Sequence, residues 1–152
     1  MSTLPTLGWR EWAALPDLGI DHIKCKIDTG ARTSALHAFY IEPDTKRNLV
    51  RFGIHPLQTR TDIELACIAT VFDQRYVTDS GGHREKRYVI ETTVTLGDSR
   101  WPIELTLTDR DSMRFRMLLG RTALQQRFIV NPAASYLIGK PKPKSKSKKL
   151  RR

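Results

Sequence analysis

Alternation of apolar and polar residues is the main regularity along this chain. Residues 23–27 (IKCKI) and 103–107 (IELTL) alternate strictly, which is the period of a half-buried β-strand. Residues 88–96 are rich in Val, Ile, Thr and Tyr, which favour strands. Shorter apolar runs predict further strands at residues 34–41, 49–54, 66–72 and 117–119. Turn-forming residues separate these runs at positions 42–44, 80–82 and 96–98.

Only two stretches have the residue types of a helix, residues 9–15 and a turn or two over residues 122–127. In the first, Trp9 and Trp12 are spaced i and i+3, which predicts that both anchor a core. Many short strands with so little helix indicate an all-β fold, either a barrel or a sandwich. The chain has no internal repeat.

Length and composition fit one domain in the cytoplasm. A chain of 152 residues can bury its own core, and no apolar run approaches the roughly 18 residues of a membrane span. The first ten residues lack the pattern of a secretory signal. Two cysteines, Cys25 and Cys67, do not make a disulfide framework, so we expect two reduced thiols.

Charge is concentrated at the C-terminus. Residues 140–152 hold eight Lys or Arg and no acid, and removing these eight charges from the net +10 leaves +2 for the rest. We therefore expect a folded domain over residues 1–139 and a disordered basic tail over residues 140–152. Such a tail either binds RNA or the ribosome weakly through its charge, or serves only solubility, and composition does not separate the two.

The segment with the clearest chemistry is residues 27–31 (IDTGA), in which a strand ends in an acid. The strand fixes the position of the Asp28 carboxylate, Thr29 can hydrogen-bond across a tight turn, and Gly30 lets another backbone approach. Alone, this tripeptide is also typical of an ordinary turn. A second segment, residues 117–121 (MLLGR), is an apolar strand that ends in glycine before the predicted helical turn.

Together these two segments resemble the retropepsin-like aspartic peptidases. The chain is similar to one bacterial branch, the RimB-like proteins labelled ATP-dependent zinc proteases and associated with RimK-type ATP-grasp ligases. Further matching stretches are residues 8–12, 26–38, 80–90 and 105–121. The resemblance covers about residues 8–139. It implies a closed acid-protease β-barrel with one or two short helices.

The resemblance also implies an aspartic peptidase that works as a homodimer. Hydrolysis by carboxylates uses one ionised and one protonated Asp, and this chain has a single Asp-Thr-Gly, so Asp28 of a second copy would complete the dyad. The ligase association suggests a glutamate-modified protein as substrate, and the nearby Lys24, Lys26 and Arg32 would favour acidic substrates. The residues implied are Asp28, Thr29 and Gly30 for catalysis, Ala31, Arg32, Gly82 and Arg87 for substrate binding, and Leu119, Gly120 and Arg121 for structural support.

Several alternatives remain beside this hypothesis. Gly82 lies either at the tip of a flap over the site or in an ordinary surface hairpin, and Arg110, Asp111 and Arg121 either form an ion-pair cluster or are solvated. The protein could be a silent adaptor for a RimK-type ligase or the ribosome. An RNA-binding barrel is less favoured, because the domain charge is only +2 and no Lys/Arg–aromatic strand pattern stands out. The motifs of ATP and zinc sites are absent, so no cofactor and no metal are expected.

Overall fold

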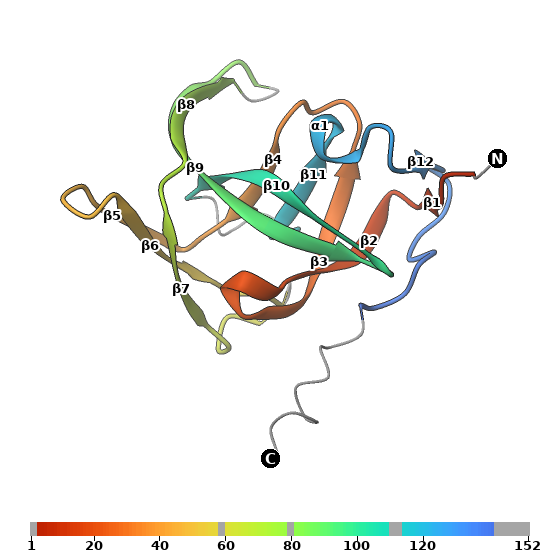
Figure 1. Cartoon of the computed structure of the whole chain (residues 1–152), viewed down its shortest axis with the longest axis horizontal. Helices are drawn as coiled ribbons and strands as arrows, with labels where there is room; N and C mark the ends of the chain where they lie inside the picture. Colours follow the sequence, from red (N-terminus) through yellow and green to blue (C-terminus); the bar gives the residue numbers. More distant parts are fainter. Residues whose placement is uncertain (1–2, 58–59, 79–80, 110–113, 142–152) are drawn as a thin grey trace, which may run out of the picture.

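The computed structural model describes residues 3–57, 60–78, 81–109 and 114–141 (Figure 1). Its strands are β1 (Thr6–Leu7), β2 (Arg10–Leu15), β3 (Ile20–Asp28), β4 (Ser34–His37), β5 (Tyr40–Asp44), β6 (Leu49–Ile54), β7 (Leu65–Thr70), β8 (Asp73–Thr78), β9 (Arg84–Leu96), β10 (Ser99–Thr108), β11 (Met117–Gly120) and β12 (Ile129–Val130). Two short helices accompany them, the 3-10 helix η1 (Pro16–Leu18) and the single turn α1 (Arg121–Leu124). The all-β prediction is confirmed.

Within the described residues, six strands close into a barrel. They pair in the order β10, β4, β11, β3, β2 and β9, and β9 pairs back onto β10 in antiparallel register. Closure leaves these strands without free edges, so their backbone hydrogen bonds are satisfied around the ring. Residues that alternate along the strands fill the interior, and the fully buried ones include Ile23, Leu36, Ile90, Leu105 and Leu119.

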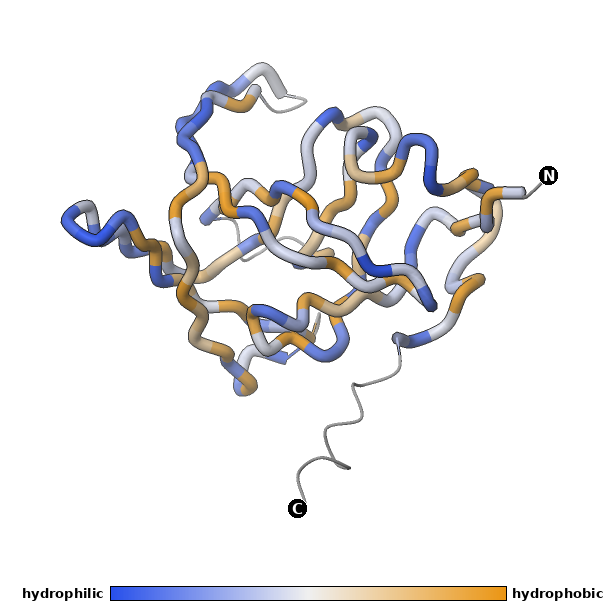
Figure 2. Tube along the Cα trace, viewed as in Figure 1, coloured by the Kyte–Doolittle hydropathy of each residue, from blue (hydrophilic) through white to orange (hydrophobic). Residues whose placement is uncertain are grey.

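A second sheet of β5, β6 and β7 lies against the barrel, and β8 extends the barrel sheet beyond β9. Val50, Phe52 and Ile54 of β6 belong to the same buried core as the barrel residues. The hydrophilic residues gather at the turn between β5 and β6 and along the β8–β9 hairpin, both of which project away from the core (Figure 2). Strands from near the two ends of the described chain also meet, since β1 pairs with β12 in parallel.

One crossing organises the barrel at the end where β3 finishes. β11 lies between β3, to which it is parallel, and β4, to which it is antiparallel. The loop that joins β3 to β4 must therefore pass over the end of β11. At this point Gly120 touches the loop backbone so closely that a Cβ would lie 2.5 Å from the Thr33 carbonyl oxygen and 2.9 Å from that of Ala31. Only glycine fits there.

The helix predicted over residues 9–15 is wrong, because this segment is strand β2. It pairs with β3, with Trp12 opposite Lys24 and Ala13 opposite Ile23, and it also contacts β9. Burial follows the period of a strand, with Glu11 and Ala13 buried and Arg10 and Trp12 half-exposed. Glu, Ala and Leu favour a helix locally, but pairing on both edges within the barrel overrides this weak preference.

Glu11 is fully buried and holds the C-terminal segment against β2. Its carboxylate accepts hydrogen bonds from the backbone N–H groups of Gly8 at 2.7 Å, Leu137 at 2.9 Å and Ile138 at 3.4 Å. A buried carboxylate is tolerated when backbone donors replace its water shell. The same segment is tied further by Trp9 N–H to the Ala134 carbonyl and Tyr136 N–H to the Arg10 carbonyl.

The C-terminal segment stays in contact with the barrel up to the last described residue. Pro141 is buried, its carbonyl lies 3.1 Å from His22 Nε2, and the Lys140 ammonium lies over the Trp12 ring. Residues 142–152 of the predicted tail lie outside the described part. None of the described helices has the length and apolar character to span a membrane.

Removing the charge of Glu11 should weaken this attachment. In Glu11→Gln the side-chain amide would turn an N–H group toward the backbone donors, so at least one strong hydrogen bond is lost. We expect the free energy of unfolding to fall by about 2 kcal/mol, measured by urea denaturation. The control is Glu42→Gln, an exposed acid of β5, which should change stability by less than about 0.5 kcal/mol. Equal stability of the two variants would contradict the anchoring role.

A methyl group at Gly120 should disrupt the crossing. We expect Gly120→Ala to cost about 3 kcal/mol or more, because the clash is with backbone that is fixed by its own hydrogen bonds. Gly82→Ala is a useful comparison, since Gly82 has a φ of 85° but nothing within 4 Å of the added Cβ. It should cost only the 1–2 kcal/mol or so of left-handed strain. If this reasoning is wrong, thermal melting would show that Gly82→Ala lowers the melting temperature more than Gly120→Ala does.

Candidate active site

Asp28 is the last residue of β3, at the crossing described above, where it lies in register with Gly120 of β11. Its Oδ1 accepts hydrogen bonds from the backbone N–H groups of Gly30 at 3.0 Å and Ala31 at 3.2 Å. The Ala31 N–H also lies 3.2 Å from the Asp28 carbonyl oxygen. Within the described residues no donor contacts Oδ2. The half-buried carboxyl is thus oriented by its own loop through Oδ1.

Arg121 and Thr122, the two residues that follow β11, hold this loop through hydrogen bonds to its carbonyl groups. Arg121 N–H donates to the Ala31 carbonyl at 2.7 Å, and its guanidinium Nη1 donates to the Thr29 carbonyl at 3.0 Å. Thr122 donates to the Arg32 carbonyl through both its N–H and its hydroxyl, the latter at 2.9 Å. Four hydrogen bonds therefore join α1 to the loop of Asp28. The structure brings the predicted support residues Gly120 and Arg121 directly to the predicted catalytic loop, while Leu119 is fully buried in the core.

A side-chain network continues this support into the barrel. Ser34 Oγ accepts from Gly120 N–H at 3.0 Å, and Thr106 Oγ1 donates to the Ser34 carbonyl at 3.1 Å. Arg87 is buried beside them, with Nη1 at 3.3 Å from Thr106 Oγ1 and Nε at 2.6 Å from Glu85 Oε1. Arg87 is thus engaged inside the protein, where its guanidinium contacts Thr106 and Glu85.

Gly82 occupies the tip region of the hairpin formed by β8 and β9. It is exposed and adopts a φ of 85°, which suits glycine in a tight turn. Figure 1 shows this hairpin projecting at the same end of the molecule as α1. Its base is fixed to the barrel, because Arg75 of β8 donates to Glu104 of β10 at 2.6 Å and to Asp73 at 2.8 Å. This pairing lowers the pKa of Asp73.

A groove of about 390 Å³ adjoins the loop of Asp28. It is lined by Arg32 and Thr33 of the loop, Thr122 and Arg127 near α1, and residues of β8, β9 and β10. Arg75 is neutralised there by its carboxylate partners, and Arg127 lies over the Trp101 ring at 5.0 Å. The exposed guanidinium of Arg32 has no ion-pair partner in the described part of the chain. It is the cation best placed to bind an anionic group beside Asp28.

Sequence reasoning missed several of these residues. Ser34 and Thr122 immediately flank the two recognised segments, so their hydroxyls had a positional signal that was not used. Glu85 and Arg87 alternate on one strand with opposite charges, which could have indicated an internal ion pair. The predicted cluster of Arg110, Asp111 and Arg121 is left open, because Arg110 and Asp111 lie outside the described residues.

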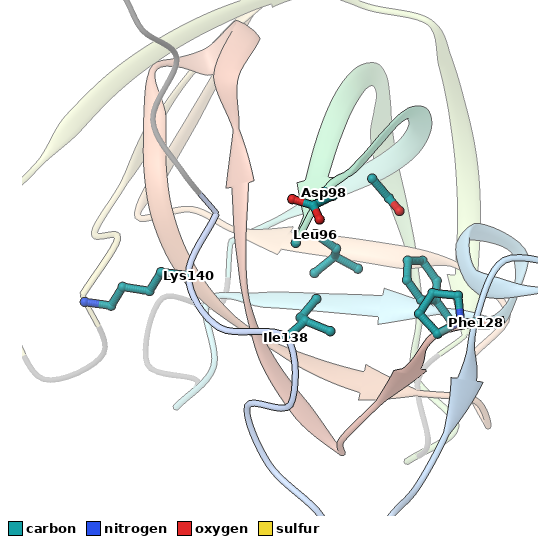
Figure 3. Close-up of a pocket in the computed structure, with 8 residues that line it drawn as sticks. Leu96, Asp98, Phe128, Ile138 and Lys140 are labelled. Atoms are coloured by element: carbon teal, nitrogen blue, oxygen red, sulfur yellow. The ribbon is translucent and has the colours of Figure 1, made fainter. Parts of the chain in front are cut away.

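We also considered the two cysteines, possible metal ligands and a second cavity as candidate sites. Burial raises the pKa of the Cys67 thiol to about 11, and burial together with the nearby Glu11 carboxylate also raises that of Cys25, so both thiols stay protonated near neutral pH. In the described residues no three side chains of His, Cys, Asp or Glu gather as metal ligands would. A cavity of about 410 Å³ lies under the C-terminal segment, where Ile138 faces Leu96 and Phe128 (Figure 3).

Comparison with known proteins agrees with the geometry. Residues 6–141 match the family described as RimB-like, retropepsin-like aspartic endopeptidase RimB. The chain is 45% identical over 135 residues to a probable alpha-L-glutamate ligase of Shewanella pealeana, covering 88% of this chain and 30% of that protein. A protein of the same name from Desulfotalea psychrophila is 40% identical over 144 residues, covering 93% of this chain and 31% of its own length. The chain therefore spans about a third of these curated relatives.

A crystal structure of protein Lpg0085 from Legionella pneumophila, of unknown function, has the same fold. Its TM-score is 0.72 at 24% identity, covering 90% of this chain and 99% of that one. The family match extends over nearly all the described residues and includes the loop of Asp28 and the crossing at Gly120. This chain belongs to the RimB-like family of retropepsin-like aspartic endopeptidases.

Proposed function

We propose that this protein is an aspartic peptidase whose catalytic dyad is formed by Asp28 of two copies in a homodimer. The observation that carries the proposal is the Asp28 carboxyl itself. One oxygen is held by two backbone N–H groups and the other is presented at the end of a rigid barrel. Such preorganisation is what a catalytic carboxylate needs, because its orientation then costs nothing at the moment of reaction.

In this mechanism the two carboxyl groups share one proton, since two like charges about 3 Å apart do not both ionise cheaply. The ionised Asp28 takes a proton from a water molecule as the water oxygen bonds to the peptide carbonyl carbon. The protonated Asp28 gives its proton to the carbonyl oxygen, forming a tetrahedral diol. When the C–N bond breaks, the now protonated carboxyl gives its proton to the departing nitrogen and the other carboxylate takes a proton from a diol hydroxyl, which becomes the carbonyl of the new carboxyl group. The dyad thus keeps its single shared proton.

A second copy is required by this chemistry. The chain holds a single Asp-Thr-Gly, and the loop that carries it is exposed at Thr29 and Gly30. A two-fold axis passing beside this loop would place two identical carboxyls face to face. The four hydrogen bonds from α1 keep each loop in the conformation that such an arrangement needs.

For the substrate we propose a protein that carries added glutamate residues. Arg32 offers a guanidinium with no ion-pair partner among the described residues, four residues after Asp28 and at the edge of the groove along α1 and β10. A guanidinium binds carboxylates in a planar, bidentate geometry, which suits a glutamate side chain next to the cleaved bond. The names of the relatives add a second argument, since a ligase that adds glutamate would provide the product on which such a peptidase acts.

A second candidate function is a silent module that binds a RimK-type ligase or the ribosome. The observation in its favour is that the curated relatives named glutamate ligases carry this region in only about 30% of their length. A domain joined to an enzyme can serve to position it rather than to react. Activity that depends on Asp28 separates the two functions.

Asp28→Asn should abolish hydrolysis while the fold persists. Asparagine keeps the shape and the acceptor for Gly30 and Ala31 but cannot ionise, so the dyad can no longer activate water. We expect cleavage of a peptide with a polyglutamate tail to fall at least about a thousandfold. The matched control is Asp21→Asn, an exposed acid on the same strand, which should keep full activity. Product release is measured by mass spectrometry, with a polyglutamine-tailed peptide beside the glutamate one.

Equal cleavage by wild type and Asp28→Asn would refute the aspartic mechanism. Absence of cleavage by the wild type at both acidic and neutral pH, on either peptide, would favour the silent module instead.

Sedimentation should reveal the dimer. At micromolar concentration we expect a species of twice the 17.4 kDa chain mass. Thr29→Arg would place a bulky charge at the exposed loop and should yield monomers, whereas Thr45→Arg at the exposed turn between β5 and β6 should not. A strictly monomeric wild type at high concentration, with substrate present, would rule out the two-copy dyad.

A further inference from the structure

Cations and aromatic rings alternate in a series of contacts on the outer face of the barrel, and the Trp12 and Tyr136 rings also meet directly, with centroids 6.3 Å apart. Arg10 lies over the rings of Trp9 at 4.6 Å and Tyr136 at 5.1 Å. Lys24 lies over Tyr136 at 5.9 Å and Trp12 at 5.3 Å, and Lys140 lies over Trp12 at 4.7 Å. The order is Trp9, Arg10, Tyr136, Lys24, Trp12, Lys140, and we call these six residues the cation ladder.

The cation ladder lies at the surface and has no acid within it. Its members on β2 and β3 point outward, opposite to the buried Glu11 and Cys25. Arg10, Trp12, Lys24 and Tyr136 are half-buried, and Lys140 is exposed. Lys26, opposite Arg10 in the strand register, adds a further exposed cation. Lys140 is one of the residues that line the pocket near Ile138, and Figure 3 shows its side chain extending away from the Leu96, Ile138 and Phe128 side chains.

Packing against the rings fixes where the charges lie. A cation held over an aromatic face loses little side-chain freedom when it later meets an anion. Tyr136 adopts a φ of 53°, which is unfavourable for an aromatic residue, and its N–H donates to the Arg10 carbonyl at 3.0 Å. Buried Glu11 holds the two residues that follow. The ring shared by Arg10 and Lys24 is therefore fixed by the backbone.

We propose that the cation ladder binds single-stranded RNA, independently of the peptidase site. Three cations in a row, separated by partly exposed rings, match a chain of phosphates joined to bases that can stack. In the sequence, seven further Lys or Arg follow Lys140 in residues 142–152. An acidic protein would need the cations but not the rings, so the alternation favours nucleic acid.

Sequence reasoning disfavoured RNA binding because no strand shows this alternation by itself. The ladder is assembled from β2, β3 and the segment after β12, and residues distant in sequence become neighbours only in the fold. The predicted helix at residues 9–15 also assigned Trp9 and Trp12 to the core. As part of a strand, Trp12 instead faces outward.

The test measures fluorescence anisotropy of a labelled 12-nucleotide single-stranded RNA with the full chain. We expect Lys24→Gln/Lys140→Gln to weaken binding at least about tenfold and to lower the salt slope by about 1.4, the value for two lost phosphate contacts. The matched control is Lys46→Gln/Arg47→Gln, which removes the same charge from the exposed turn between β5 and β6. This control should bind within about twofold of wild type.

A second variant tests the rings. Trp12→Leu leaves every charge in place, and we expect about tenfold weaker RNA binding from lost stacking and lost positioning of Lys24 and Lys140. Thermal melting checks that Trp12→Leu is folded. If it proves too unstable, Tyr136→Leu replaces it and should weaken RNA binding to the same extent. Polyglutamate of equal charge serves as competitor.

Three outcomes would overturn the proposal. The first is that wild type does not bind RNA at about 100 mM salt. The second is that the Lys46/Arg47 control loses as much RNA affinity as the Lys24/Lys140 variant. The third is that polyglutamate binds as tightly as RNA and that Trp12→Leu weakens both equally. The last result would assign the surface to acidic proteins. Cleavage by Lys140→Gln alone should be unchanged, so these outcomes are separate from those of Asp28→Asn.

Discussion

The passage of the β3–β4 loop over the end of β11 is the constraint on which the rest of the structure depends. Two backbones meet there with no room for a side chain, which restricts Gly120 to glycine and places Asp28 beside it. Because β11 is paired on both sides, the loop cannot shift without breaking strand pairing in the barrel. A tightly packed crossing of this kind gives an exposed carboxyl the rigidity of a core residue.

Around this crossing, polar groups are used in two different ways. Ser34, Thr106 and Arg87 are buried and form a chain of hydrogen bonds that ends at the exposed Glu85, so they support the loop from the barrel side. Arg32 is on the outside of the same loop and has no ion-pair partner in the described part of the chain. Arg87 is therefore occupied within the protein, whereas Arg32 faces solvent.

The sequence predicted most of the strands because alternation is a local signal, and β6 matches its predicted bounds of residues 49–54. It also singled out the segments of Asp28 and Gly120, which the fold brings into register. Local signals could not show that residues 9–15 pair on both edges, nor that Arg87 turns inward to Glu85, since both depend on distant partners. The outward position of Trp12 was missed for the same reason.

The buried carboxylate of Glu11 has a consequence for how the protein is made. Glu11 is synthesised well before two of its three donors, residues 137 and 138, and β1 likewise precedes its partner residues 129 and 130. Until these residues are made, the Glu11 carboxylate lacks two of its three backbone donors. Contacts over such long separations slow folding. The barrel is thus completed only after nearly all of the described chain has been synthesised.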